Sequence, residues 1–115
     1  MQHTCTIKNN FEFRRLYQKG RSAASPTLVV YMRRRKGQEN RIGFTVTVKL
    51  GHAVVRNRIR RRLREIYRLH EKDLCEGASL VVVARGRSVK APYRELERDF
   101  LAACGQLGLR RSAAE

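Results

Sequence analysis

The segment from residue 53 to residue 68 constrains this chain most, because it combines a helical apolar stripe with an extreme charge. Apolar residues spaced four, four and three positions apart predict an α-helix with one face on a core. The predicted stripe consists of Val55, Ile59, Leu63, Ile66, Leu69 and His70. The same segment holds seven arginines and one glutamate.

This charge is unfavourable for a helix on its own. Like charges four residues apart, such as Arg60 and Arg64, repel each other, and the first turn of a helix disfavours cations. Only Glu65 offers relief, toward Arg61 and Arg68. The net cost is roughly 1–3 kcal/mol, and such a cost is typical of a functional site. Because a polyanion would remove it, we predict that the helix faces phosphate.

The overall composition agrees with this prediction. The 115 residues carry 26 Lys+Arg against 10 Asp+Glu, a formal charge of +16 spread along the whole chain. The length suits one domain, residues 1–115, and a hydrophobic content of 42% argues against wholesale disorder. Nucleic acid is therefore the leading partner class. No apolar run could span a membrane, and three widely spaced cysteines without a signal peptide favour the cytoplasm.

Periodicity and turn residues predict six elements around one sheet. A helix capped by Asn9 or Asn10 ends at Gly20, and a turn-rich connection covers residues 21–26. The later segments are a strand at 27–32, a basic hairpin loop at 33–40, a strand at 41–49, a helix at 53–69, a strand at 79–84 and a helix from Pro92 to Gly108. The fold class is thus α+β, an α/β sandwich of order α-β-β-α-β-α. Its β-α-β crossover is right-handed by default.

A polar, partly aromatic groove is predicted on the sheet. Strand 41–49 alternates, with Ile42, Phe44, Val46 and Val48 facing the core and Thr45, Thr47 and Lys49 facing away. Tyr31 alternates with Leu28, Val30 and Met32, and Phe13 shares a helix face with Leu16 and Tyr17. Aromatic rings beside cations stack unpaired bases, although Phe13 and Tyr17 are equally well explained as core residues.

Catalysis by the chain itself has little support, and we predict no catalytic residue and no protein-bound metal. No nucleophile–base set or phosphate-binding glycine loop is recognisable, and the histidines and cysteines lack zinc-site spacing. His70 is expected to pack in the core, and His52 either caps the basic helix or contacts RNA. Cys104 is predicted to be a core residue. The acidic residues of the last helix, Glu95, Glu97 and Asp99, look like a solvated face.

These residues resemble a known family. The run Arg56-Asn-Arg-Ile-Arg-Arg61, preceded by Lys49-Leu-Gly-His-Ala-Val-Val55, is similar to the signature of the bacterial ribonuclease P protein subunit. The resemblance covers residues 7 to about 109, the expected core. It includes Asn10-Phe-Glu-Phe13, Gly20, Arg41-Ile-Gly43 and Leu80-Val-Val-Val-Ala-Arg85. Two positions depart from the family pattern: His52 replaces a common asparagine, and Val48 replaces a frequent lysine.

The resemblance implies a small protein that joins a catalytic RNA, which removes the 5′ leader of precursor tRNA with Mg²⁺ held mainly by the RNA. It implies a left-handed crossover and no obligatory protein partner. The implied contacts to the catalytic RNA are Arg56, Asn57, Arg58, Arg60 and Arg61, to which Arg64 is added from the same charged surface. The implied leader-binding residues are Phe13, Tyr17, Tyr31, Thr45, Thr47 and Lys49.

Two other functions stay open on the residues alone. A general RNA chaperone or ribosomal-type RNA-binding protein would carry the same charge but would need no aromatic groove. A basic amphipathic element for acidic membranes would show Trp, Phe or Leu on its apolar face and little other structure. This chain has no Trp and three predicted strands, so the membrane alternative is disfavoured.

Overall fold

The computed structural model describes residues 4–7, 10–37 and 39–110. Their regular elements are β1 (Thr4–Thr6), α1 (Asn10–Lys19), β2 (Arg21–Ala24), β3 (Leu28–Arg34), β4 (Asn40–Thr45), α2 (Ala53–His70), β5 (Ala78–Ala84) and α3 (Tyr93–Gln106). Short 3-10 helices cover Val48–Leu50 (η1), Glu71–Asp73 (η2) and Gly86–Val89 (η3). The described strands form one mixed sheet of order β1-β4-β5-β3-β2.

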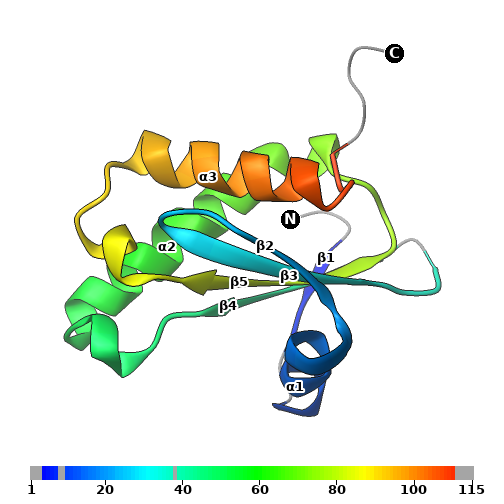
Figure 1. Ribbon diagram of the computed structural model, residues 1–115, viewed down its shortest axis with the longest axis horizontal. Helices are drawn as coiled ribbons and strands as arrows, with labels where there is room; N and C mark the ends of the chain where they lie inside the picture. Colours follow the sequence, from blue (N-terminus) through cyan, green and yellow to red (C-terminus); the bar gives the residue numbers. More distant parts are fainter. Residues whose placement is uncertain (1–3, 8–9, 38, 111–115) are drawn as a thin grey trace.

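The architecture is three-layered. Helices α2 and α3 cover one face of the sheet, and α1 lies across the other (Figure 1). Strands β4 and β5 are adjacent and parallel, and α2 connects them, so the predicted β-α-β unit and the α+β class are confirmed. The left-handedness implied by the family resemblance stays a prediction.

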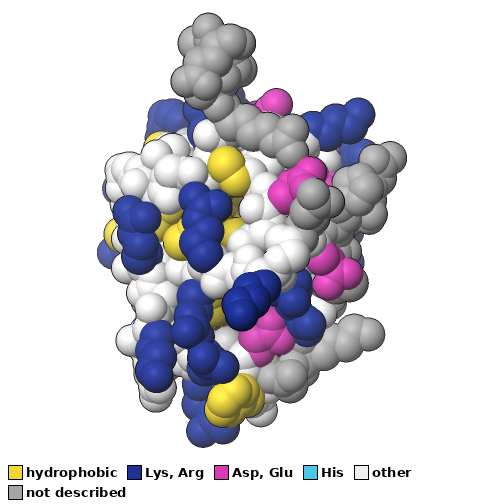
Figure 2. Space-filling model, turned by 90° about the vertical axis from the view of Figure 1, so that its right-hand side faces the viewer, with side chains coloured by type: hydrophobic (Ala, Val, Ile, Leu, Met, Phe, Trp, Pro, Cys, Tyr) yellow, Lys and Arg dark blue, Asp and Glu magenta, His cyan; other side chains and the backbone are white. Residues whose placement is uncertain are grey.

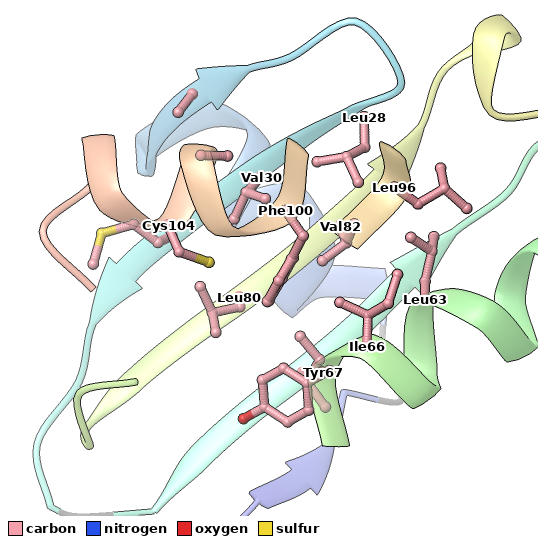
Figure 3. Close-up of a cluster of buried hydrophobic side chains, with 14 of the residues drawn as sticks. Leu28, Val30, Leu63, Ile66, Tyr67, Leu80, Val82, Leu96, Phe100 and Cys104 are labelled. Atoms are coloured by element: carbon pink, nitrogen blue, oxygen red, sulfur yellow. The ribbon is translucent and has the colours of Figure 1, made fainter. Parts of the chain in front are cut away.

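Strand β5 holds the layers together because its side chains enter a core on both faces. Leu80 and Val82 pack under α2 and α3, whereas Val81 packs under α1 with Leu16. In the larger core, side chains of α2 and α3 converge on this strand, as Tyr67 and Phe100 illustrate (Figure 3). The continuous apolar run at 79–84 therefore predicted a central, doubly covered strand correctly.

The ends of the helices follow the expected signals. Helix α1 begins at Asn10 and ends before Gly20, whose amide donates to the Leu16 carbonyl at 3.0 Å. Asn10 is the first residue of the helix, and Asn9, the other predicted cap, lies outside the described residues, so the capping of α1 stays a prediction. Pro92 precedes α3, and Gly108 follows it in the left-handed region, at φ 71°.

The predicted strand pairing needs three corrections. Residues 33–40 do not form a hairpin, because β5 lies between β3 and β4 in the sheet. Residues 21–24, predicted as a connection, form strand β2 against β3, and β1 adds a further edge strand. Strand β4 ends at Thr45 rather than residue 49, and Val48, predicted to face the core, is 73% exposed.

Two predicted helix faces are also wrong in part. On α2, Tyr67 is fully buried and continues the row of Leu63, while Leu69 on the other flank is 51% exposed. On α3, Asp99 is buried rather than solvated, because its carboxylate accepts hydrogen bonds from the amide and hydroxyl of Thr27 at 3.0 and 2.6 Å. These bonds compensate the loss of hydration.

Candidate nucleic-acid interface

The basic helix α2 begins directly after a tight backbone turn. Gly51 has φ 141°, a conformation that favours glycine, and His52 then takes the extended N-cap position. His52 thus occupies the predicted cap position, but its exposed side chain makes no capping hydrogen bond. Its contact with RNA stays a prediction.

Several arginines of α2 bond to the protein itself. Arg56 Nε donates to the Gly51 carbonyl at 3.2 Å, which braces the first turn. Arg58 and Arg62 donate to the carbonyls of Val89 and Ala91, both at 3.4 Å. These two bonds connect α2 to the segment that leads from β5 into α3. Arg56 and Arg58 are thus partly structural, which the sequence pattern did not reveal.

The remaining charge of α2 faces solvent. Arg61 and Arg64 are exposed and make no hydrogen bond or ion pair within the part of the chain that the structure describes. Glu65 pairs with Arg68, whose hydrogen bond lowers the pKa of that carboxyl. The additional relief expected at Arg61 is not seen. The helix therefore presents uncompensated cations, as the sequence predicted.

A surface depression lies between α1, the end of β4 and α2, and we call it the aromatic groove. It is lined by Asn10, Phe13, Arg14, Tyr17, Phe44, Thr45, Val46 and Arg60. Three predicted leader-binding residues are therefore brought together, and Arg60, predicted to contact the catalytic RNA, lies at the same site. The structure thus makes the two predicted surfaces continuous at Arg60, which also bonds to the exposed Asn57 at 3.0 Å.

The aromatic rings that line this groove are held by specific contacts, including one with the neighbouring Tyr31. Tyr17 and Tyr31 pack edge to face, with ring centroids 5.0 Å apart and planes at 78°. The Tyr17 hydroxyl lies 2.7 Å from Thr45 Oγ1. Phe13 lies over Gly43, where an added Cβ would approach the ring to 2.7 Å. Gly43 is therefore required for the ring to lie against β4.

The burial of the rings bears on whether Phe13 and Tyr17 are core residues or surface residues, a choice that the sequence left open. Phe13 and Tyr31 pack against the smaller core of Ile7, Leu16 and Val81, and Tyr17 remains 38% exposed. Phe13 and Tyr17 line the groove and keep an accessible side, whereas Tyr31 packs on the smaller core and on Tyr17.

Three predicted groove residues do not line the depression, namely Tyr31, Thr47 and Lys49. Tyr31 is joined to it only by packing against Tyr17. Thr47 and Lys49 are exposed, but β4 ends before them, so the alternation that placed them beside Thr45 is interrupted. Conversely, the prediction missed Arg14 and Asn10. Their signal was helical spacing, because Arg14 lies one turn before Tyr17 on α1.

The described histidine and acidic side chains outside these surfaces form internal contacts, as His70 shows. His70 packs between helices with Nε2 2.7 Å from Glu97 Oε2, and Asp73 lies 3.6 Å from Nδ1. Glu97 is thus an internal partner rather than part of a solvated face. Among the described residues, no three His, Cys, Asp or Glu side chains gather in a way that could hold a metal. Within the same residues, no helix has the length and apolar content to cross a membrane.

Comparison with known proteins gives consistent matches. The family model described as Ribonuclease P matches residues 1–108. The "Ribonuclease P protein component" of Alkaliphilus metalliredigens is 41% identical over 101 residues, covering 88% of this chain and 91% of the relative. That of Natranaerobius thermophilus is 37% identical over 101 residues, with 88% of each chain covered.

Solved structures agree in fold. The Staphylococcus aureus RNase P protein superposes with a TM-score of 0.84 at 30% identity, covering 92% of this chain and 97% of that one. The RNase P protein from Thermotoga maritima gives a TM-score of 0.78 at 24% identity, covering 84% of this chain and 92% of that one, which supports the fold.

Proposed function

Because this chain belongs to the ribonuclease P protein family, we propose that it is the protein subunit of a ribonuclease P ribonucleoprotein. In this role it binds the catalytic RNA and the 5′ leader of precursor tRNA. The complex then removes the leader by Mg²⁺-dependent endonucleolytic cleavage and forms the mature tRNA 5′ end. The observation that carries the proposal is the exposed, unpaired arginine surface of α2 beside an aromatic groove. This role requires the protein in the cytoplasm, with its two RNA partners.

The charge of α2 supports contact with a folded RNA. Arg61 and Arg64 project from a rigid helix that is packed on the core through Ile59, Leu63 and Ile66. A guanidinium binds phosphate oxygens in bidentate fashion, and the packed helix fixes the spacing of the positions from which these two side chains project. The surface is therefore suited to the closely spaced phosphates of a structured RNA.

The aromatic groove supports contact with an unpaired strand. Its rings alternate with a hydroxyl and with the cations Arg14 and Arg60. Bases stack on rings irrespective of sequence, while cations hold the backbone. A leader that varies among tRNA precursors needs this kind of tolerant recognition. The proximity of Arg60 to the groove would place the leader next to the catalytic RNA.

We further propose that the chain itself is not the catalyst. The groove offers aromatic rings, hydroxyls, an amide and cations, and its described lining includes no carboxylate or histidine. Mg²⁺ prefers carboxylate and other oxygen ligands, so this cationic surface does not fit a resident Mg²⁺ site. The protein residues would bind and orient RNA, and the metal would be held by the RNA.

Reconstitution tests the proposal. Rigorously RNA-free protein should not cleave precursor tRNA, and addition of the cognate catalytic RNA with Mg²⁺ should produce mature 5′ ends. Cleavage by the protein alone would refute the non-catalytic role. The RNA that copurifies is a second readout, since ribosomal RNA instead of one long structured RNA would favour a ribosomal-type protein.

A further inference from the structure

A second basic depression lies on the other flank of α1, where that helix meets the end of β3. We call it the α1–β3 depression. It shares no lining residue with the aromatic groove. Its lining consists of Phe11, Glu12, Arg15, Leu16, Arg33, Arg34, Arg35, Lys36 and Ser79. On α1, Phe11 and Arg15 form one i,i+4 pair and Phe13 and Tyr17 another, so the helix divides the two surfaces.

The charge of this depression is largely uncompensated. Glu12 pairs with Arg41 at 2.9 Å, and Arg35 pairs with Glu39 at 3.5 Å. The other lining cations, namely Arg15, Arg33, Arg34 and Lys36, have no acidic partner within residues 4–7, 10–37 and 39–110. Figure 2 views the end of the molecule that carries the β3–β4 connection and shows Lys and Arg side chains gathered on one part of it.

Phe11 gives this basic surface an exposed aromatic ring. Its side chain is 63% exposed, and it belongs to neither core cluster. The Arg15 guanidinium lies 5.7 Å from the ring centroid, which orients the ring by a cation–π contact. Because it lies outside both core clusters, the ring adds little to the stability of the core. An oriented, exposed ring among cations has the elements of a stacking platform for unpaired bases.

We propose that the α1–β3 depression is a second binding site for single-stranded RNA, separate from the aromatic groove. One unpaired base stacks on Phe11, and the adjoining phosphates contact Arg33, Arg34 and Lys36. A duplex does not fit this arrangement, since its bases are already stacked and paired. The inference rests on the proposed function only in taking RNA as the partner.

Binding of a labelled oligouridylate to the full chain tests the stacking contact. Phe11→Ala should weaken binding by about 5-fold or more, the effect of losing one base–aromatic stack. Phe11→Tyr keeps the ring and should restore the affinity. An RNA duplex of equal length should bind both variants alike. Unchanged oligouridylate affinity in Phe11→Ala, or equal weakening in both variants, would overturn the stacking site.

A pair of matched charge variants tests the location. Arg33→Gln/Arg34→Gln should weaken oligouridylate binding and lower the slope of log K against log salt by about 0.7 for each phosphate that the variant no longer neutralises. The control, Arg87→Gln/Arg94→Gln, removes the same charge far from the depression. Arg87 follows Ala84, the end of β5 that pairs with Leu28, whereas Arg34 pairs with Ala78 at the other end of that strand. Equal weakening in both double variants would overturn the site in favour of general electrostatics.

A failure of the second RNA site can be distinguished from a failure of the proposed function. A holoenzyme that processes precursor tRNA, with oligouridylate binding insensitive to Phe11, refutes the second site alone. Phe11-dependent oligouridylate binding in a protein that activates no catalytic RNA refutes the proposed function alone.

Discussion

The Tyr17 hydroxyl lies 2.7 Å from Thr45 Oγ1 and joins helix α1 to the end of strand β4. The same tyrosine packs edge to face on Tyr31 of β3. One side chain thus connects three elements at the aromatic groove. Its ring is placed by the fold before any RNA arrives, and preorganisation of this kind reduces the entropic cost of binding.

Tyr17→Phe should separate the hydrogen bond from the ring. The variant no longer bonds to Thr45 but retains packing on Tyr31, so the free energy of unfolding should fall by no more than about 1 kcal/mol. Denaturant titrations of Tyr17→Phe, Thr45→Val and the double variant measure this. The double variant should be about as stable as the worse single variant. Additive effects would mean that the two hydroxyls do not interact.

Tyr31→Ala should weaken the holoenzyme's affinity for precursor tRNA and leave its affinity for mature tRNA nearly unchanged. A base stacked on an aromatic ring contributes about 1–3 kcal/mol, so the loss could reach tenfold or more. The two RNAs differ only in the leader, so their comparison isolates the groove. Tyr31→Phe is the control, because it preserves the ring and its packing against Tyr17. Equal weakening toward both RNAs would exclude leader contact at Tyr31.

The fold was predictable where a segment carried its own pattern. The 3.6-residue stripe of α2 and the apolar run of β5 specify their elements locally. The neighbour order was not predictable, since β5 inserts between β3 and β4 only when α2 returns the chain to the sheet. Strands β1 and β2 were missed because they are short, with three and four residues, and take their conformation from pairing.

The candidate site was predictable in residue type but not in placement. Alternation placed Tyr31 off the larger core correctly, yet the same rule failed at Thr47, because β4 ends at Thr45 and η1 begins shortly after it. Which arginines of α2 are free also depends on distant carbonyls, such as that of Val89. Contacts between residues so far apart in the chain leave no periodic signal in the sequence.

Cys104 should make stability depend on pH in the alkaline range. Burial raises the pKa of its thiol to about 12, while an unfolded thiol ionises near about 8.5. The folded chain therefore holds this proton more tightly. The resulting stabilisation is complete below about pH 8.5 and is lost as pH rises toward 12.

Unfolding titrations at increasing pH check this prediction. The decline with pH should be steeper for the wild type than for Cys104→Ala, because other groups titrate in both proteins. Cys104 should also resist thiol reagents until the protein unfolds, unlike the half-buried Cys75. Parallel pH profiles of the two proteins, or rapid labelling of native Cys104, would contradict the assignment.

Arg61→Gln and Arg58→Gln should separate RNA binding from folding on helix α2. Arg61 is exposed without a described protein partner, so its loss should weaken binding to the catalytic RNA. The slope of log K against log salt should fall by about 0.7–0.9 for one phosphate contact. Stability should stay the same or rise slightly, since Arg61→Gln reduces repulsion along the helix.

Arg58→Gln should instead lower stability by about 0.5–1 kcal/mol, because it removes the bond to the Val89 carbonyl that attaches α2 to the β5–α3 segment. Thermal melts and RNA titrations of both variants, run in one buffer series, give the comparison. A matched loss of stability in Arg61→Gln would mean that its side chain serves the fold. A normal salt slope in that variant would remove Arg61 from the RNA interface and shift the proposed contact toward Arg64 and Arg60.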